Sequence, residues 1–325
     1  MIDIKENESL SKYTTFHLGG VAKYFVVVKT EEELREALDF AVKNNLRYFI
    51  LGGGSNLLFG DEGFDGLVIK IFFMEIEIGE DWVSAGAGVP LLLLIKKTAE
   101  AGLAGLEGFA GIPGTVGGAV CGNAGAYGKS VADFLEKAEI LIPSPVIPAK
   151  AGIQTFETEV VGREWFEYQY RGSKLKYWDK SEPRPIILKA WFKLAKGEPE
   201  AIGARIQEIL SGRTQKEPKG FCAGCAFKNI KGAQVEELLK KDIFSPDEKN
   251  LFALRRAIPA AWFIDRAELK GKKINGAFVP AEHANYVMND GTAKAGDIIA
   301  MLSYIKQQVR DKFGVQLEEE IEIII

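Results

Sequence analysis

Hydrophobic and polar residues follow two different periods along this chain of 325 residues. Residues 21–28 are apolar and β-branched, which predicts a buried strand. Residues 31–44 repeat apolar side chains at helical spacing, and Thr30 with Glu33 forms a capping-box pattern at the start of that helix. Residues 48–51 are again apolar and predict a second strand. The first fifty residues therefore predict a β-α-β unit.

The same two periods continue through the rest of the chain. Short apolar segments at 67–71, 74–78, 82–85, 137–142 and 186–194 predict strands. Amphipathic or apolar helical patterns predict helices at 90–101, 199–210, 232–240, 260–267 and 296–313. Gly314 is a typical helix stop, and residues 315–325 are predicted to form a final strand. Residues 143–154 contain three prolines and no clear period, which predicts a surface insertion.

Glycine is concentrated between residues 105 and 128, where nine of 24 residues are glycine. Average usage of about 7% predicts about two. The single proline excludes a collagen repeat, and the apolar residues Leu106, Phe109 and Val116 argue against a disordered linker. We therefore favour a packed loop whose bare N–H groups approach a ligand such as phosphate, over a core segment of tight turns.

A second glycine cluster follows the predicted strand 48–51 and has the sequence GGGSN. Three consecutive glycines exceed what a turn requires, so this segment is a second candidate ligand loop. The chain has no Gly-x4-Gly-Lys-Ser/Thr sequence, which argues against a P-loop NTPase. It also has no Gly-x-Gly-x-x-Gly after a strand, so a Rossmann dinucleotide fold is not supported.

Composition and charge narrow the class of protein. Charged residues make up 26% of the chain and the net charge is −4, without a basic stripe, which argues against a nucleic-acid partner. No apolar run approaches the ~18 residues of a membrane span, and the first residues lack the pattern of a signal peptide. Three cysteines make no disulfide framework. We therefore expect a cytoplasmic protein with no membrane association.

Several isolated residues could carry chemistry. Cys222 and Cys225 form a C-x-x-C pair, but the sequence lacks a second ligand pair for zinc and the strand-to-helix turn of a thioredoxin site. No metal is predicted, and the pair is interpreted as a coincidence with at most one functional cysteine. Arg171 lies among aromatic residues, as either a stacked surface group or a buried anion clamp. Residues 318, 320 and 322 are glutamates on one face of the last strand, a pattern typical of a solvated surface.

Seven segments occur in an order that resembles one family. They are TTF and GG within 14–20, LGGGSNLL at 51–58, GLEGFAGIPGTVGGAVCGNAGAYG at 105–128, YRGS at 170–173, GCAFKN at 224–229, HANYVMN at 283–289 and LEEE at 317–320. Together they resemble the UDP-N-acetylenolpyruvoylglucosamine reductases, flavoenzymes that make UDP-N-acetylmuramate for bacterial cell walls. The resemblance covers nearly the whole chain.

The resemblance implies an α+β fold. It predicts an FAD-binding domain of the vanillyl-alcohol-oxidase (PCMH) type in two subdomains, at 1–68 and 69–197. An α+β substrate-binding domain is expected at 198–325, with its last strand returning toward the active site. The insertion at 143–154 matches nothing in the family pattern. No tyrosine-bearing insertion separates Arg171 from the 224–229 motif, so the chain resembles the shorter subclass of the family. The resemblance does not identify the segment that covers the bound substrate.

The implied reaction has two steps. NADPH reduces a non-covalently bound FAD, and the flavin hydride then passes to the β-carbon of the enolpyruvyl sugar nucleotide, after which the α-carbon is protonated. The two glycine loops resemble the FAD-binding segments of the family. The implied cofactor-binding residues are Gly52, Gly53, Gly54, Ser55, Asn56, Leu57, Gly111, Ile112, Pro113, Gly114, Thr115, Gly117, Gly118, Ala119, Asn123, Ala124 and Gly125.

The family motifs also imply catalytic and substrate-binding residues. Arg171 and Glu320 match the groups that stabilise an enolate, the arginine by charge and the glutamate, if protonated, by a hydrogen bond. Cys225 stands where many members have a proton-donating serine, and a thiol is a stronger acid than an alkyl hydroxyl, so Cys225 is the predicted general acid. Lys228, Asn229 and Glu282 are predicted to bind the nucleotide substrate.

Two other functions fit parts of the sequence. One is an FAD-dependent oxidase of the same fold, in which His17 or Cys121 would be the candidates for covalent flavin attachment. The other is a non-catalytic protein that binds a flavin or a sugar nucleotide. The presence of Arg171, Cys225 and Glu320 together argues against the second.

Overall fold

The computed structural model describes residues 2–143, 156–179 and 182–325, and these form two compact units. The first unit comprises Met1–Ser9, Val21–Gly54 and Gly63–Gln215, and the second comprises Leu10–Gly20, Ser55–Glu62 and Lys216–Ile325. The predicted domain boundaries at 68/69 and 197/198 stay a prediction. The two short segments from the first sixty residues that join the second unit had no signal in the sequence.

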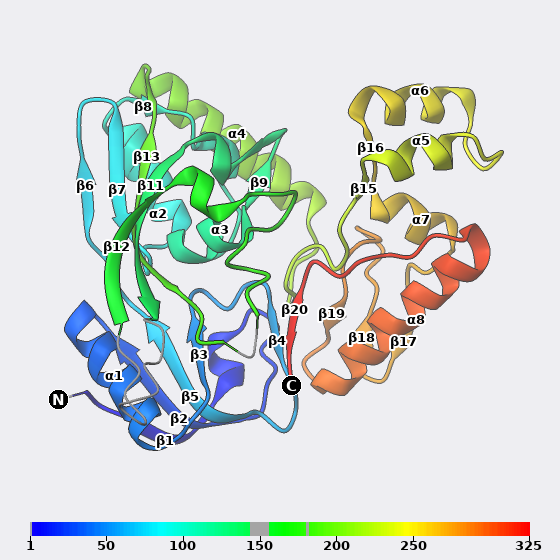
Figure 1. Cartoon of the computed structure of the whole chain (residues 1–325). Helices are drawn as coiled ribbons and strands as arrows, with labels where there is room; N and C mark the ends of the chain where they lie inside the picture. The colour runs from blue at the N-terminus through cyan, green and yellow to red at the C-terminus, as the bar shows by residue number, and fades with distance from the viewer. Residues whose placement is uncertain (1, 144–155, 180–181) are drawn as a thin grey trace. The chain divides into compact units, whose positions relative to one another are not determined.

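The first unit contains a mixed four-stranded sheet near its N-terminal end (Figure 1). Its strand order is β1 (Lys5–Ser9), β2 (Val21–Val28), β5 (Phe64–Ile71), β3 (Tyr48–Leu51), and β2, β5 and β3 are parallel. The crossover from β2 to β3 is α1 (Glu31–Lys43), which buries Leu34, Ala37, Leu38 and Ala41. Thr30 caps α1 by accepting a hydrogen bond from the backbone of Glu33. The predicted β-α-β unit is therefore confirmed.

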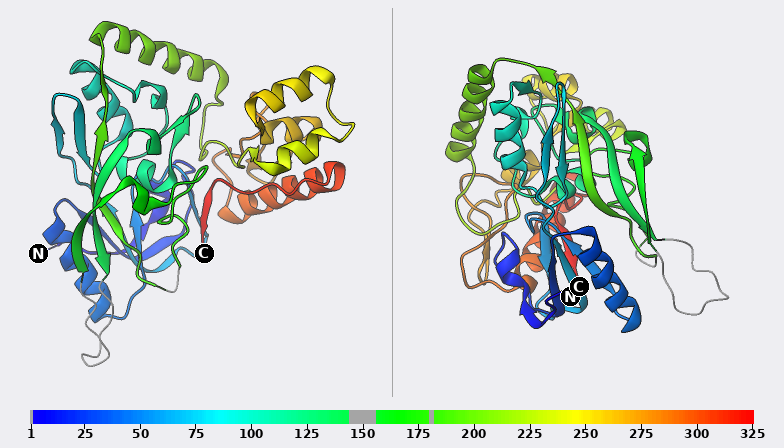
Figure 2. Two further views of the ribbon diagram at one scale, coloured as in Figure 1. Left: turned by 45° about the horizontal axis from the view of Figure 1, so that its top comes forward. Right: turned by 90° about the vertical axis from the view of Figure 1, so that its left-hand side faces the viewer.

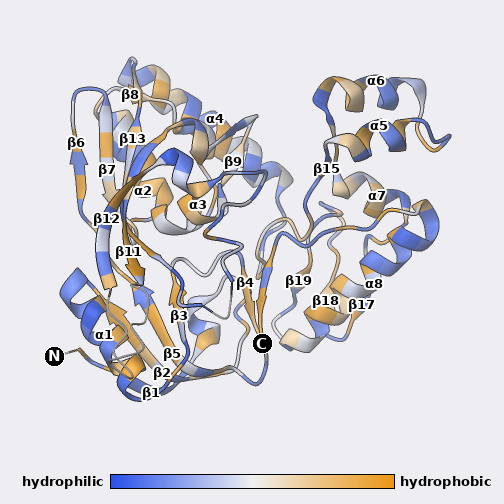
Figure 3. Cartoon of the chain, viewed as in Figure 1, coloured by the Kyte–Doolittle hydropathy of each residue, from blue (hydrophilic) through white to orange (hydrophobic). Residues whose placement is uncertain are grey.

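The first unit also contains an antiparallel five-stranded sheet. Its order is β12 (Phe156–Gly162), β11 (Leu135–Pro143), β13 (Ile186–Lys193), β7 (Trp82–Gly86), β6 (Ile76–Ile78). Helices α2 (Leu91–Glu100), α3 (Val116–Gly122) and α4 (Pro199–Lys216) lie on one face of this sheet (Figures 1 and 2). Side chains from these helices and from both sheets form one continuous hydrophobic core, and Figure 3 shows the apolar residues concentrated on the strands.

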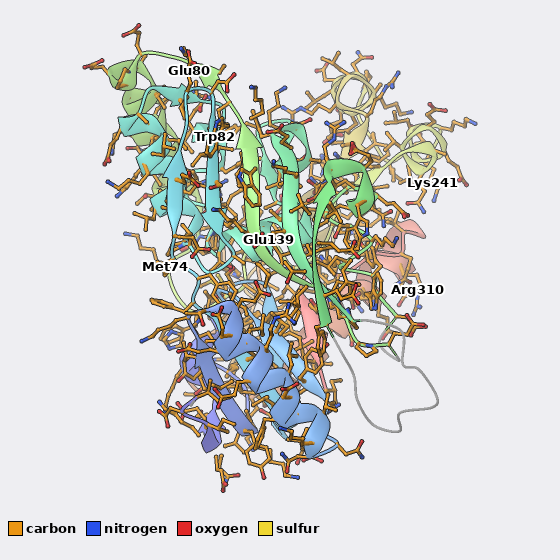
Figure 4. All side chains as sticks on the ribbon, turned by 60° about the vertical axis from the view of Figure 1, so that its left-hand side comes forward. Met74, Glu80, Trp82, Glu139, Lys241 and Arg310 are labelled. Atoms are coloured by element: carbon orange, nitrogen blue, oxygen red, sulfur yellow. The ribbon has the colours of Figure 1, made fainter. Side chains whose placement is uncertain are left out.

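The remaining elements of the first unit are short. Figure 4 shows the β6–β7 hairpin, with Glu80 in its turn and Trp82 at the start of β7, and it labels Glu139 on β11. The other short elements are β8 (Leu103–Ala104) paired with β14 (Ala195–Lys196), β9 (Gly125–Ala126) paired with β10 (Lys129–Ser130), and the 3-10 turns Glu107–Phe109, Val131–Asp133 and Arg163–Phe166.

The predicted insertion at 143–154 falls almost wholly outside the described residues. Pro143 and Phe156 are register partners at the ends of the antiparallel strands β11 and β12. The chain between them therefore joins two paired strand ends. Strand β12 was missed because the proline-rich stretch before it obscured the start of a period-two pattern.

The second unit consists mainly of helices with short strands. Its helices are the 3-10 turn Leu10–Tyr13, α5 (Ala233–Leu239), α6 (Pro246–Arg255), α7 (Ala260–Arg266) and α8 (Ala295–Phe313). Its strand pairs are β4 (Leu57–Phe59) with β20 (Glu322–Ile324), β15 (Ile230–Lys231) with β16 (Ala257–Ile258), and β17 (Lys273–Ile274), β18 (Ala277–Phe278) and β19 (Met288–Asn289) in one sheet. Its core includes Phe16, Leu18 and Leu58 from the early segments.

Two predictions for the chain after residue 197 were wrong in extent. Residues 315–325 were expected to form one strand, but only Glu322–Ile324 do so, in parallel pairing with β4. Helix α4 was expected to end near residue 210 and continues to Lys216. Helix α6 was missed altogether. Within the described residues, no helix has the length and apolar character needed to cross a membrane.

Candidate active site

The two glycine loops lie directly against each other in the first unit. A Cβ atom placed on Gly53 would lie 2.7 Å from Cα of Gly114, and one placed on Gly52 would lie 2.7 Å from Oγ1 of Thr115. Gly54 adopts a positive φ of 64°, a conformation that disfavours any side chain. At Gly53 and Gly114 the two loops thus meet backbone to backbone, which suits close approach of a phosphate-bearing ligand.

Other predicted cofactor residues of the second loop have internal structural roles. Gly117 packs on Ala87, where an added Cβ would lie 2.8 Å from the alanine Cβ, and its N–H donates to the Ala87 carbonyl at 2.9 Å. Thr115 is the N-cap of α3 and accepts a hydrogen bond from Gly118 N–H at 3.4 Å. Gly111 packs against Arg213 of α4, with an added Cβ 2.5 Å from its Cδ.

The end of α3 is fixed by Asn123. This residue adopts the left-handed conformation, with φ of 48°, and is the C-cap of the helix. Its side chain donates to the Gln169 carbonyl at 2.9 Å and accepts from Ala132 N–H at 3.1 Å. Asn123 therefore stabilises the fold of the loop. The other predicted residues of this loop, Ile112, Pro113, Ala119, Ala124 and Gly125, line the same segment before, within and after α3.

Lys70 on β5 was missed by the sequence reasoning. Its Nζ donates a hydrogen bond to the Gly52 carbonyl at 2.9 Å, and burial lowers the pKa of this amine from its ordinary value. Lys70 thus fixes Gly52, the first glycine of the loop that follows β3. A lysine within an apolar strand was the only signal that could have found it.

Arg171 lies on a loop that is attached to the second glycine loop. It adopts a positive φ of 57°, and its Nη1 donates to the Gly125 carbonyl at 2.7 Å. The guanidinium lies 5.6 Å from the ring centroid of Tyr170, and the side chain is half-buried. The ring contact agrees with a stacked arginine, and the role of Arg171 as an anion clamp stays a prediction.

The carbonyl groups at the end of α3 hold the Arg171 loop in place. The last carbonyls of a helix have no intrahelical donor and need other partners. The Tyr168 hydroxyl donates to the Val120 carbonyl at 3.0 Å, and the Ser173 hydroxyl donates to the Cys121 carbonyl at 2.6 Å. Burial raises the pKa of Tyr168, which keeps its hydroxyl protonated as a donor. The sequence predicted Arg171 and residues 111–125 separately, and the structure brings them together.

In the second unit, Cys225 and Glu320 lie on adjacent segments of backbone. Residues 225–228 run antiparallel to 318–320, with bridge partners Phe227 and Glu319. Glu320 N–H donates to the Ala226 carbonyl at 2.8 Å, and Lys228 N–H donates to the Glu318 carbonyl at 2.9 Å. Two residues that are almost a hundred positions apart in the sequence are thus held in one register.

A third segment completes this arrangement on the other side of residues 225–228. Cys225 is the bridge partner of Tyr286, and Ala226 N–H donates to the Asn285 carbonyl at 2.7 Å. The predicted general acid therefore lies on the middle of three segments, within the GCAFKN motif and between the HANYVMN and LEEE motifs. All three motifs were named from the sequence, but their pairing was not.

The three residues predicted to bind the substrate differ in their burial and in their partners. The Lys228 side chain is buried, and its Nζ forms an ion pair with the Glu318 carboxylate, which is 69% exposed. Asn229 accepts a hydrogen bond from Ala260 N–H at 3.2 Å through its Oδ1, at the first residue of α7. Glu282 is exposed in the turn before His283. Their roles toward a substrate stay predictions.

Ser55, Asn56 and Leu57, predicted to bind the cofactor, belong to the second unit. The Asn56 side chain donates to the Glu320 carbonyl at 2.9 Å, and Glu322 N–H donates to the Asn56 carbonyl at 3.0 Å. The segment that follows the first glycine loop is thus hydrogen-bonded to the backbone that carries Glu320. Asn56 has a role that the sequence did not reveal.

The remaining cysteines and histidines have identifiable surroundings. Burial raises the pKa of the Cys222 thiol, which favours its neutral form. Cys121 accepts a hydrogen bond from Arg184 at 2.9 Å, and His17 stacks on Phe221 with ring centroids 4.2 Å apart. Across the part of the chain that the structure describes, no three His, Cys, Asp or Glu residues are grouped to hold a metal ion.

Comparison with known proteins identifies the family of this chain. Residues 22–144 match the family described as FAD binding domain, and residues 216–324 match UDP-N-acetylenolpyruvoylglucosamine reductase, C-terminal domain. A protein of Chloroflexus aurantiacus named UDP-N-acetylenolpyruvoylglucosamine reductase is 33% identical over 99% of this chain and 98% of its own length. The chain belongs to the UDP-N-acetylenolpyruvoylglucosamine reductase family.

Further relatives of this family cover the same length. The reductase of Geobacter metallireducens is 34% identical over 99% of this chain and 94% of its own. The crystal structure of UDP-N-acetylenolpyruvylglucosamine reductase from Thermus caldophilus has a TM-score of 0.73 at 31% identity and covers 100% of this chain and 99% of that one. The predicted family and α+β fold with a PCMH-type FAD-binding domain are therefore confirmed.

The residues present fit the cofactor of this family. The region matched to the FAD binding domain contains both glycine loops, and bare backbone at the contact between Gly53 and Gly114 suits a pyrophosphate-bearing cofactor. The chain is an FAD-dependent oxidoreductase of the reductase family.

Proposed function

We propose that this chain reduces UDP-N-acetylenolpyruvoylglucosamine to UDP-N-acetylmuramate, with NADPH as the reductant and a non-covalent FAD as the carrier. The family relationship over the whole length carries this proposal. The product is a precursor of peptidoglycan, so the reaction would contribute to cell-wall synthesis and through it to cell shape and division. A cytoplasmic location stays a prediction from the sequence.

The reaction requires three groups from the protein: a cation, a hydrogen-bond donor and a proton donor. Bound FAD supplies a two-electron carrier between NADPH and the enolpyruvyl double bond. Hydride addition at the β-carbon leaves negative charge on the α-carbon and its carboxylate. That charge needs a cation and a hydrogen-bond donor, and the α-carbon needs a proton.

Three residues of this chain match those needs. Arg171 carries a permanent positive charge and is anchored through Gly125, beside the glycine loop. Glu320, when protonated, donates a hydrogen bond to the developing enolate, and its backbone is held by Ala226 and Asn56. Cys225 donates the proton to the α-carbon. Lys228 and Asn229 are proposed to bind the nucleotide part of the substrate.

An anaerobic two-step experiment tests this function. The purified protein is saturated with FAD, and NADPH is added first, which should bleach the flavin absorbance. The enolpyruvyl nucleotide is added next, and the oxidised flavin spectrum should return with formation of UDP-N-acetylmuramate. Return of the spectrum only on admission of oxygen would instead identify an oxidase.

A simple control tests the attachment of the cofactor. Denaturing and precipitating the protein should release yellow FAD into the supernatant. Colour that stays in the precipitate would show covalent attachment and contradict a non-covalent cofactor.

A further inference from the structure

The main-chain N–H and C=O groups of Phe227 are both hydrogen-bonded to a side chain. Along an extended segment, successive N–H and C=O groups point to opposite sides. The Ala226 C=O and the Lys228 N–H therefore point toward residues 318–320, where they pair with Glu320 N–H and the Glu318 C=O. The N–H and C=O groups of Phe227 point to the other side and need partners there.

The Asn285 side chain supplies both of these partners. Its Oδ1 accepts from Phe227 N–H at 3.0 Å, and its Nδ2 donates to the Phe227 carbonyl at 2.8 Å. The amide thus replaces a neighbouring strand for one residue. Asn285 is only 2% exposed, so water cannot substitute for it, and leaving buried backbone groups without partners is costly.

The main chain of the same residue makes a third connection to the Cys225 segment. The Asn285 carbonyl accepts from Ala226 N–H at 2.7 Å, and the next residue, Tyr286, is the bridge partner of Cys225. Ala226 in turn accepts from Glu320 N–H. Asn285 therefore fixes the backbone on which Cys225 lies, and this backbone also fixes Glu320.

We propose that Asn285 is a positioning residue that sets the place of Cys225 for proton delivery and the register of Glu320 beside it. The proposal rests on the function proposed above. Its basis is the buried amide that satisfies both peptide groups of Phe227. Asn285 itself transfers no proton, and its effect is confined to the second half-reaction, in which the reduced flavin is re-oxidised and the substrate is protonated.

The test uses Asn285→Asp and Asn285→Ala in the full-length, FAD-loaded protein. The aspartate variant keeps an acceptor for Phe227 N–H but, when ionised, has no donor for the Phe227 carbonyl. The alanine variant loses both. A misplacement of about 1 Å costs on the order of 100-fold in rate. We therefore expect re-oxidation of reduced flavin by the enolpyruvyl nucleotide to slow by about 10- to 100-fold, more in the alanine variant.

Asn289→Asp is the matched control. Asn289 is also buried in the second unit, at 5% exposure, and its Nδ2 donates to the Phe16 carbonyl at 2.9 Å. Its side chain also accepts from Gly291 and Ala293 N–H, so its side-chain hydrogen bonds hold other segments than residues 225–228. The control should lose a comparable buried hydrogen bond without slowing substrate protonation selectively.

Three further measurements separate positioning from loss of stability. Flavin reduction by NADPH and the Kd for FAD should stay unchanged in the Asn285 variants. The solvent deuterium isotope effect on flavin re-oxidation should rise, because proton transfer becomes more nearly rate-limiting. Amide exchange at Ala226 and Phe227, measured on the protein without substrate, should accelerate in Asn285→Ala and not in Asn289→Asp.

The outcomes distinguish this inference from the function on which it rests. If the unmodified protein is not re-oxidised by the nucleotide, the proposed function fails. If it is re-oxidised but the Asn285 variants slow both half-reactions equally, or behave like Asn289→Asp, the positioning role is overturned. Faster amide exchange with an unchanged isotope effect and rate would also overturn it.

Discussion

The two units hold their predicted site residues in different ways. In the first unit, the glycine loops approach so closely that Gly53 has no room for a side chain, and helix-end carbonyls hold the Arg171 loop. In the second, Cys225 and Glu320 lie on irregular segments joined by isolated bridges and by the amides of Asn285 and Asn56. The first part is specified mainly by backbone, and the second by a few buried polar side chains.

This difference predicts that changes in the two units affect different steps. Substitutions where the two glycine loops touch should act on FAD binding, because they change the backbone surface available to the cofactor. Substitutions around Cys225 should act on the protonation of the substrate and leave FAD and its reduction unaffected. The following predictions test this separation, beginning with the largest effect.

Cys225→Ala should produce the largest and most selective defect. General acid catalysis contributes about 100- to 10,000-fold, so flavin re-oxidation by the enolpyruvyl nucleotide should slow by that order. Reduction of FAD by NADPH requires no proton on the substrate carbon and should stay near normal. Stopped-flow absorbance of the flavin follows both steps.

Two further variants are the controls for this experiment. Cys225→Ser should recover part of the activity, because a positioned hydroxyl can relay a proton despite its higher pKa. Cys222→Ala should have little effect, since Cys222 matches no catalytic position of the family motifs. Equal slowing of both steps in Cys225→Ala would show that Cys225 is not the general acid. A larger defect in Cys222→Ala would show that Cys222 is the functional thiol.

Gly53→Ala should weaken FAD binding. The added Cβ would lie 2.7 Å from Cα of Gly114, so one of the two loops must shift. Overpacking of this kind costs about 1–3 kcal/mol, which corresponds to roughly 5- to 150-fold in Kd when the loops form the FAD surface. Fluorescence titration of the apoprotein with FAD measures the Kd.

Gly122→Ala is the matched control for Gly53→Ala. Gly122 lies at the end of α3 with nothing within 4 Å of its added Cβ, and we expect the Kd for FAD to stay within about threefold, since surface substitutions usually change stability by less than about 0.5 kcal/mol. A normal Kd in Gly53→Ala would show that the contact between the loops has no part in the cofactor site.

Glu248→Gln should have the smallest effect and should change stability alone. Glu248 belongs to the capping box of α6, where its carboxylate accepts hydrogen bonds from Trp262 and from Ser245 N–H, and these lower its pKa to about 2. Loss of the charge should lower the free energy of unfolding by about 1 kcal/mol at neutral pH. Urea denaturation measures this difference.

The pH dependence of that difference follows from the direction of the shift. A carboxylate whose folded pKa is lowered stabilises the fold above its ordinary pKa near 4.5 and loses this contribution as pH falls toward 2. The difference between Glu248→Gln and the unmodified protein should therefore shrink in acid. Glu237→Gln, at an exposed site on α5, should show no such difference, and a constant gap down to pH 3 would contradict the assignment.

Local signals in the sequence predicted local structure well. The cap at Thr30 and the apolar period of residues 34–41 identified α1, because both depend on near neighbours. Helix α6 carried an equally clear cap in Ser245, Pro246 and Glu248, but it buries little more than Phe252, so its apolar period was too weak to notice. The glycine loops were recognisable because dense glycine is unusual wherever it occurs.

Long-range contacts could not be predicted in the same way. Nothing near Asn285 indicates that its amide pairs with Phe227, and nothing near Lys70 indicates that its amine reaches Gly52. The strand predicted at 315–325 is only three residues long, because its partner, β4, consists of only Leu57–Phe59. The ordered family motifs named Cys225 and Glu320, but only the structure showed that their segments pair.

The early segments that belong to the second unit also govern the order of events during protein synthesis. Chains fold progressively from their N-terminal end as they emerge. The second unit cannot be completed that way, because residues 10–20 and 55–62 must wait for their partners. Phe16 receives its hydrogen bond from Asn289, and β4 pairs with β20, so both contacts close very long loops. The ribosome must therefore deliver almost the entire chain before Glu320 can reach its place, and residues 216–325 expressed alone would lack the strand and the amide that hold it.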